Sequence, residues 1–237
     1  ERNRICLNFL FCINPLSKGA EYQLWQSANA PYTNVRNSKS KDGILPINND
    51  EELAGVVSDV GEKLQQIQDY LGQNPSGENK IRFPRGFIRT ADHFRNKLFF
   101  IENRDVRDNL AYALILSDVY RWITNRTDLY GIAREMIIKA GIVLSGSIAE
   151  TIMVEYTKGR IGRRHGVAAR CDRMAEAGML SGRLSEELKW LWEIRGGMHI
   201  YEVGEREYER YSMADYNRAI YALRNLREEL EVDHLGF

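Results

Sequence analysis

The stretch DLYGIAREMIIKAGIVLSGSIAETIMVEYTKG, residues 128–159, decides the fold of this chain. Apolar residues occupy a wide face of it at helical spacing, and few charged residues interrupt them. A helix that is apolar over so much of its surface has to be buried against several neighbours. We therefore expect a long, deeply buried helix here, which ends near Gly159 and Gly162.

Helical patterns continue on both sides of this stretch. Residues 90–126 fit one long helix or two, and residues 166–180 fit a shorter helix. In the next segment, residues 181–200, Ser185 is the predicted N-cap, because Glu186 and Glu187 follow it in the first turn.

The last helical pattern covers residues 212–232. It begins with Ser212, and Asp215 follows three residues later as a variant of the capping box. The sequence therefore predicts a mainly α protein, an up-and-down bundle of four or five main helices.

The N-terminal third has a different character. Residues 14–50 are rich in Asn, Ser, Lys and Gly, which is typical of irregular structure. A helix should start after Asn49 or Asp50, with an apolar stripe formed by Leu53, Val56, Val57, Val60, Leu64, Ile67 and Leu71. We expect residues 1–84 to be an irregular N-terminal extension with one amphipathic helix, and residues 85–237 to form the bundle.

The composition of the chain limits the functions that it can have. The chain has 237 residues, of which 43% are hydrophobic and 28% charged, and its formal net charge is zero. Attraction to nucleic acid must therefore come from a local patch. The cysteines Cys6, Cys12 and Cys171 form no metal-site or disulfide pattern, so we expect a reducing, cytoplasmic setting. Charged residues interrupt every long apolar run, and we expect no membrane span.

The segment WLWEIRGGMHIY, residues 190–201, places two basic side chains on a buried face. Arg195 continues the face of Leu188 and Leu191, and His199 lies one helical turn further on. A buried charge without a partner is expensive, so this face requires an internal acid, a second subunit or a ligand. In a purely structural interpretation, the glycines end the helix, Arg195 pairs with an acid such as Glu150, and His199 is a hydrogen-bonded interior residue.

Over roughly residues 90–232 the chain resembles the HEPN family of small helical domains. Ser147 and Glu150 match the Ser-x-x-Glu pattern of its second long helix, and Arg195 and His199 match its Arg…His motif. The sequence from His199 to Tyr201 is similar to the His-x-Tyr tail of HEPN toxins that are paired with a nucleotidyltransferase antitoxin.

This resemblance implies a metal-independent endoribonuclease in a prokaryotic toxin–antitoxin or anti-phage defence setting. It implies RNA as substrate, a homodimer with the site between subunits, a possible antitoxin protein as partner, and no cofactor. Arg195 and His199 would carry catalysis, Glu150 would orient Arg195, and Tyr201 would contribute secondarily.

The residue types suit that chemistry. The RNA 2′-hydroxyl is an internal nucleophile, His199 could move a proton near neutral pH, and Arg195 could stabilise charge on the phosphoryl oxygens. No HExxH metal motif or GxxxxGK[ST] phosphate loop is present in the sequence. Gly196, however, takes the place of the family's usual polar residue. That favours an alternative, a catalytically inactive HEPN-like module that binds a protein partner or a nucleotide.

A basic segment follows the central helix and contains no acid. Its cations are candidates for contacts with RNA phosphates: Lys158, Arg160, Arg163, Arg164 and Arg170. The same segment can equally be a solvated loop between helices. In a third hypothesis, the N-terminal third carries specificity, as a recognition or antitoxin-docking element.

Overall fold

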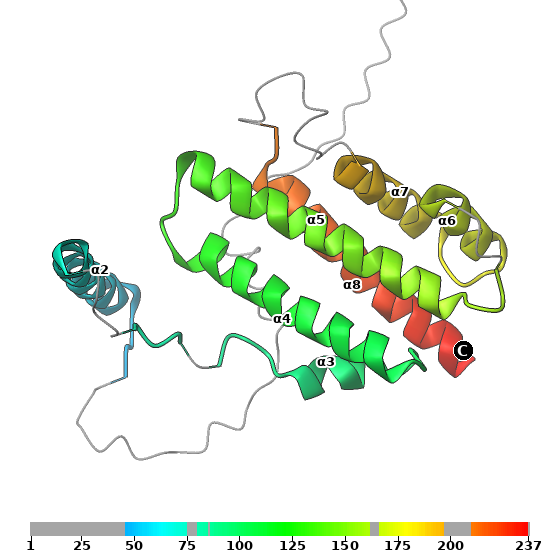
Figure 1. The fold of residues 1–237 in the computed structure, drawn as a ribbon, viewed down its shortest axis with the longest axis horizontal. Coiled ribbons are helices and arrows are strands. Elements are labelled where there is room, and N and C mark those ends of the chain that lie inside the picture. The colour runs from blue at the N-terminus through cyan, green and yellow to red at the C-terminus, as the bar shows by residue number, and fades with distance from the viewer. Residues whose placement is uncertain (1–45, 75–79, 85, 162–165, 197–209, 237) are drawn as a thin grey trace, which may run out of the picture. The chain divides into compact units, whose positions relative to one another are not determined.

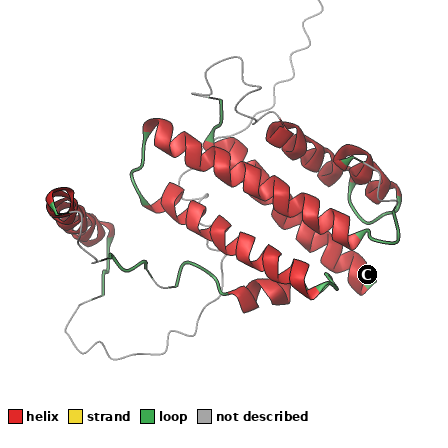
Figure 2. Cartoon of the chain, in the orientation of Figure 1, coloured by secondary structure: helices red, strands yellow, loops and turns green. Residues whose placement is uncertain are grey.

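The computed structural model describes residues 46–74, 80–84, 86–161, 166–196 and 210–236. Within these ranges the regular structure consists of seven helices, and no strand is present (Figure 2). The expectation of a mainly α helical bundle is confirmed. The chain divides into two compact units, Glu1–Arg82 and Phe83–Phe237, which are described separately below.

The first unit contains helix α2, Asp50–Gln73. Asn49 is its N-cap, as expected, because the Asn49 side chain accepts a hydrogen bond from the Glu52 backbone N–H at 2.8 Å. Asp50, Glu51 and Glu52 place negative charge at the positive end of the helix dipole. None of the residues of α2 is buried, and its predicted apolar stripe is open to solvent.

The second unit begins with two helices where the sequence allowed one or two. Helix α3 spans Ala91–Lys97 and helix α4 spans Arg104–Arg126. The connection between them buries Leu98 and Ile101, and Asn103 caps α4. The two helices pack against each other, so the break folds α3 back onto α4.

Helix α5, Gly131–Tyr156, is the centre of the bundle. It packs against α4, α8 and α7, and Figure 1 shows it running along α4 and α8. Ile142, Ile148 and Ile152 are almost fully buried, which agrees with the expectation from the wide apolar face. Among the described helices, α5 is long and apolar enough to cross a membrane, but half of its most apolar window is buried in the bundle. Such burial is typical of a core helix in a soluble protein.

The remaining helices are α6, Val167–Glu176, α7, Gly182–Gly196, and α8, Met213–Leu235. Helices α6 and α7 pack together as a pair, and α7 also contacts α5 and α8. The capping box of Ser212 and Asp215 is present at the start of α8. Figure 1 shows α6 and α7 side by side at one end of α5.

The start of α7 differs from the prediction. The helix begins at Gly182, before Ser185, and Ser185 is buried within it. The Ser181 hydroxyl accepts a hydrogen bond from the Leu184 backbone N–H at 3.2 Å and therefore acts as the cap. The prediction was wrong because two serines precede this acidic turn, and the more N-terminal one is the capping residue.

A glycine sets the distance between α5 and α8. A Cβ added to Gly141 would lie 2.5 Å from Cε2 of Tyr216, far inside van der Waals contact. The Tyr216 side chain is 1% exposed and cannot swing into solvent to make room. The aromatic ring therefore packs directly against the backbone of the central helix at this position.

We predict that Gly141→Ala destabilises the bundle by about 1–2 kcal/mol. The overpacking cost of about 1–3 kcal/mol exceeds the gain in helix propensity of about 1 kcal/mol. Thermal or denaturant unfolding of the full chain measures the difference. Gly182→Ala is the matched control, because a Cβ there meets no atom within 4 Å. Equal or greater stability of Gly141→Ala would contradict the close approach described here.

Candidate functional site

The candidate site lies where the C-terminal end of α7 crosses the middle of α5. Helix α7 ends at Gly196, so Arg195 occupies its last turn. Gly146, on α5, faces the Arg195 side chain: a Cβ added to Gly146 would lie 3.0 Å from Cδ of Arg195 and 3.4 Å from its Cβ. Gly146 is thus a packing residue, and its packing partner is the aliphatic part of Arg195.

Glu150 lies one helical turn beyond Gly146 and accepts a hydrogen bond from Arg195. The distance between Nη1 of Arg195 and Oε2 of Glu150 is 2.8 Å. The Arg195 and Glu150 side chains are 27% and 32% exposed, so the ion pair lies at the edge of the bundle and not in its core. A solute can therefore reach the pair.

Trp192 completes the environment of Arg195. The guanidinium carbon lies 4.6 Å from the centroid of the Trp192 ring, in a cation–π arrangement. Stacking and the Glu150 contact together restrain the planar guanidinium, while part of its surface stays open. This role of Trp192 was not predicted, although its position three residues before Arg195 on a helix already puts the two side chains on one face.

His199 and Tyr201, the other predicted catalytic residues, lie outside the residues that the structure describes. The structure therefore brings Arg195 and Glu150 together and says nothing of the Arg195–His199 geometry. The contact fits both interpretations of the sequence, the catalytic one, in which Glu150 orients Arg195, and the structural one, in which Glu150 neutralises it. In the described part of the chain, no atom lies within 4 Å of a Cβ added to Gly196.

The predicted RNA-binding cations have different environments. Lys158 is 49% exposed and pairs with Glu155 at 3.0 Å. Arg160 is 54% exposed, and its guanidinium lies 5.2 Å from the centroid of the Tyr156 ring and 3.8 Å from Asp233. Both side chains are accessible at the C-terminal end of α5. Arg163 and Arg164 lie outside the described residues.

The prediction for Arg170 is corrected by its burial. Arg170 is 3% exposed, and its guanidinium donates a hydrogen bond to the hydroxyl of buried Thr157. It therefore links α6 to the end of α5 in the interior, where a phosphate of RNA cannot reach it. Arg170 lies close to the loop cations in the sequence. In the structure it belongs to α6, and its side chain is buried in the bundle.

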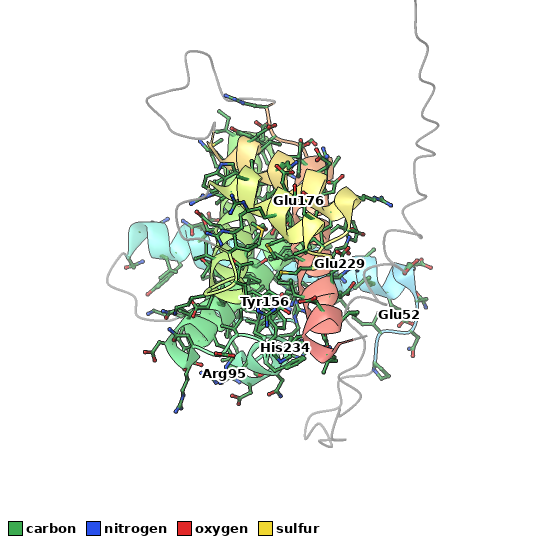
Figure 3. The ribbon with its side chains drawn as sticks, turned by 90° about the vertical axis from the view of Figure 1, so that its right-hand side faces the viewer. Glu52, Arg95, Tyr156, Glu176, Glu229 and His234 are labelled. Atoms are coloured by element: carbon green, nitrogen blue, oxygen red, sulfur yellow. The ribbon has the colours of Figure 1, made fainter. Side chains whose placement is uncertain are left out.

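Tyr156 anchors the same end of α5 to α8. Its hydroxyl donates a hydrogen bond to Oδ2 of Asp233 at 2.5 Å, and burial raises its pKa to about 12. The Tyr156 and His234 rings lie 6.5 Å apart, and Figure 3 labels both residues. This contact fixes the C-terminal end of α5, from which Lys158 and Arg160 project.

A second charged cluster, which was not predicted from the sequence, lies inside the bundle. Asp118 on α4 is 2% exposed, and the Arg89 guanidinium donates two hydrogen bonds to it, of 2.9 and 2.5 Å. The Arg89 backbone N–H donates a third at 3.1 Å. Burial, and then the charge of Arg89, lower the pKa of Arg121, and the same two causes lower that of Arg227 to about 10. The charge of Asp118 opposes these shifts at both arginines, and Glu228 does so more strongly at Arg227.

The one sequence signal for this cluster is an acid within an apolar run, ALILSDVY, around Asp118. Such an acid at a buried position needs a partner. The partner, Arg89, lies outside any regular element and far away in sequence, so spacing could not identify it.

Comparisons with known proteins give no further indication: no family model, no curated protein and no solved structure matches the chain. Among the described residues, no group of three or more His, Cys, Asp or Glu side chains could hold a metal ion. The candidate site therefore stands on its own geometry.

We predict that Asp118→Asn lowers the free energy of unfolding by about 3–5 kcal/mol, because it leaves a buried cation without its counter-charge. Denaturant unfolding measures the change. Asp92→Asn is the matched control: Asp92 also pairs with an arginine, Arg95, at 2.7 Å, but its side chain is 84% exposed. Loss of the Asp92 charge should change the free energy of unfolding by less than about 1 kcal/mol. Similar losses in both variants would contradict the structural importance of the internal pair.

Proposed function

We propose that the chain is a metal-independent endoribonuclease of HEPN type that acts as a homodimer. The observation that carries the proposal is the restrained, solvent-accessible guanidinium of Arg195, held by Glu150 and Trp192 at the end of α7. His199 follows four residues later in the sequence, close enough along the chain to act on the same phosphodiester.

In the proposed reaction, His199 accepts the proton of the RNA 2′-hydroxyl as the 2′-oxygen attacks the adjacent phosphorus. The bond from phosphorus to the 5′-oxygen breaks, and that oxygen takes up a proton. The products are a 2′,3′-cyclic phosphate and a free 5′-hydroxyl. Arg195 stabilises the charge that grows on the phosphoryl oxygens, and two donors of its planar fork can face them while Nη1 binds Glu150.

Glu150 is a positioning residue in this proposal. The Glu150 carboxylate, 2.8 Å from Nη1, fixes the rotation of the Arg195 guanidinium. A flexible arginine would otherwise lose conformational entropy when it orders around the phosphate. Tyr201 has a secondary role. A toxin–antitoxin or defence setting, with an antitoxin protein as partner, completes the proposal and follows from the family resemblance alone. The proposed cytoplasmic location follows from the cysteine pattern.

The alternative is a catalytically inactive HEPN-like module that binds a protein partner or a nucleotide. The same ion pair favours it to some extent, because Glu150 neutralises part of the charge that would otherwise act on a phosphate. Gly196, in place of a polar residue, favours it as well.

We predict that Arg195→Ala lowers the rate of RNA cleavage by about 100-fold or more, because a fixed cation at the phosphate is removed. His199→Ala should lower the rate by a factor of about 100 or more through loss of proton transfer. The assay uses the full chain, single-stranded and structured RNA, and EDTA, with end-group analysis for the cyclic phosphate. Arg134→Ala, at an exposed position near the start of α5, is the control.

Glu150→Gln separates positioning from charge removal. If Glu150 orients Arg195, the variant lowers kcat with little change in KM, since the amide still accepts a hydrogen bond but holds the cation less firmly. Intact RNA at high concentrations of the wild-type chain would support the binding module. Cleavage that survives in Arg195→Ala and His199→Ala would remove the proposed site altogether.

We predict that charge reversal at Arg163 and Arg164 weakens RNA binding, most strongly at low salt. Removing one cation from a phosphate reduces the slope of log K against log salt by about 0.7 for a single strand. Filter binding or fluorescence anisotropy across a salt series measures the effect, and Arg134→Glu is the control for net charge against each single reversal. Unchanged RNA binding in the double variant would mean that the loop contributes only to solubility.

A further inference from the structure

Helix α2 has no tertiary support of its own among the described residues. None of its residues is buried, and it contains three glycines, Gly55, Gly61 and Gly72, with open space around them. Glycine lowers helix propensity, and most of the stability of a helix in a protein comes from the packing of its amphipathic face. A stable α2 therefore calls for a partner on its apolar face.

That face has the spacing of a coiled-coil seam. Its six core positions are alternately four and three residues apart: Leu53, Val57, Val60, Leu64, Ile67 and Leu71. The first five of these side chains are 40–61% exposed. Val56 and Tyr70 widen the apolar face on one side, and the repeat of four and three is the pattern by which two like helices interdigitate.

We propose that α2 is a self-association element, and that the occupant of its apolar seam is α2 of a second copy of this chain. The residues beside the seam permit this pairing. Gly61 and Gln68 flank it on one side, and Val56, Lys63 and Tyr70 flank it on the other. The middle of the seam thus carries a single charged flanking residue, Lys63.

The position of Lys63 favours parallel helices. In a parallel, in-register pair, Lys63 of each copy lies opposite the uncharged Gln68 of the other. An antiparallel pair centred on the same repeat would place two Lys63 ammonium groups opposite each other. The parallel arrangement also pairs identical apolar residues layer by layer along the whole seam.

The surface of the second unit offers no comparable stripe among its described residues. Its exposed large apolar side chains are scattered over loops and over α4, α5 and α8: Phe83, Phe99, Tyr112, Leu116, Tyr130, Ile132, Val154, Tyr221, Val232 and Leu235. Single exposed apolar residues are normal on soluble proteins, while a long contiguous stripe marks an interaction site. A like helix therefore fits α2 better than the bundle does.

An open hollow of about 560 Å³ lies at the C-terminal end of the seam, beside Ile67, Tyr70 and Leu71. Lys80 and Ile81 also line it. Apolar side chains from a second copy would fill this hollow and continue the seam. The proposal does not depend on the proposed ribonuclease, although it would hold two copies together for a site shared between subunits.

The test is the mass of the full chain in solution, measured by light scattering after size exclusion and by sedimentation over a range of concentrations. We expect the wild type to self-associate and Leu64→Asp to form a smaller assembly at the same concentration. Ser58→Asp adds the same charge on the polar face of α2, away from the seam, and should leave the mass unchanged.

A second variant covers the case in which Leu64→Asp unfolds α2. Leu64→Ala keeps a strong helix former but removes the interdigitating side chain, and it should weaken association at least about tenfold. The thermal unfolding of the bundle checks that the second unit is intact in all variants.

Three outcomes would overturn the proposal. The first is a monomeric wild type, and the second is an equal mass for the wild type and both Leu64 variants. The third is that these variants become more sensitive to protease without a change in mass, which would mean that another part of the same chain covers the seam. RNA cleavage is scored separately, so an inactive enzyme with the expected masses counts against the ribonuclease and not against this interface.

Discussion

The enclosure of α5 by α4, α7 and α8 is the constraint on which the bundle depends. A helix that is apolar on most of its surface gains free energy only if several neighbours cover it at once. Glycines on this helix allow two of those neighbours to come close. Gly141 receives the ring of Tyr216 from α8, and Gly146 receives the stem of Arg195 from α7.

The bundle contains one ion pair in its interior and another near its surface. Asp118 and Arg89 form a nearly buried pair that lies among further arginines and stabilises the bundle from within. Arg195 and Glu150 form a pair at the rim, where about a third of each side chain is open. A buried pair is suited to holding a segment outside the helices against the bundle, whereas a rim pair can exchange a protein contact for a ligand contact at lower cost in desolvation.

Much of the fold could be predicted from local signals. The apolar face of residues 128–159 and the caps at Asn49 and Ser212 depend on residues that are close in sequence, so they could be read directly. Predictions from the sequence were wrong or missing for features that depend on tertiary structure. Ser181 and not Ser185 caps α7, and Arg170 turns inward to bind Thr157. The internal pair of Asp118 with Arg89 joins positions 29 residues apart.

Half of the candidate site was also accessible from the sequence. Glu150 was a candidate partner of Arg195 because a basic side chain on a buried face needs an acid, and the structure places the two charged groups 2.8 Å apart. The stacking of Trp192 and the accommodation of Arg195 by Gly146 were not predicted, because both depend on the rotation of α7 against α5.

The contact between Gly146 and the stem of Arg195 has a consequence for how this chain can vary. A methyl group at position 146 would press on the aliphatic stem of the half-buried Arg195 side chain, and no isoleucine of the core is among the nearest atoms. Such a change would be nearly neutral in a screen for folding and yet would shift a cation by a fraction of an ångström. Fold and charge placement are thus separable at this residue, because a substitution there can keep the scaffold and still move the Arg195 guanidinium.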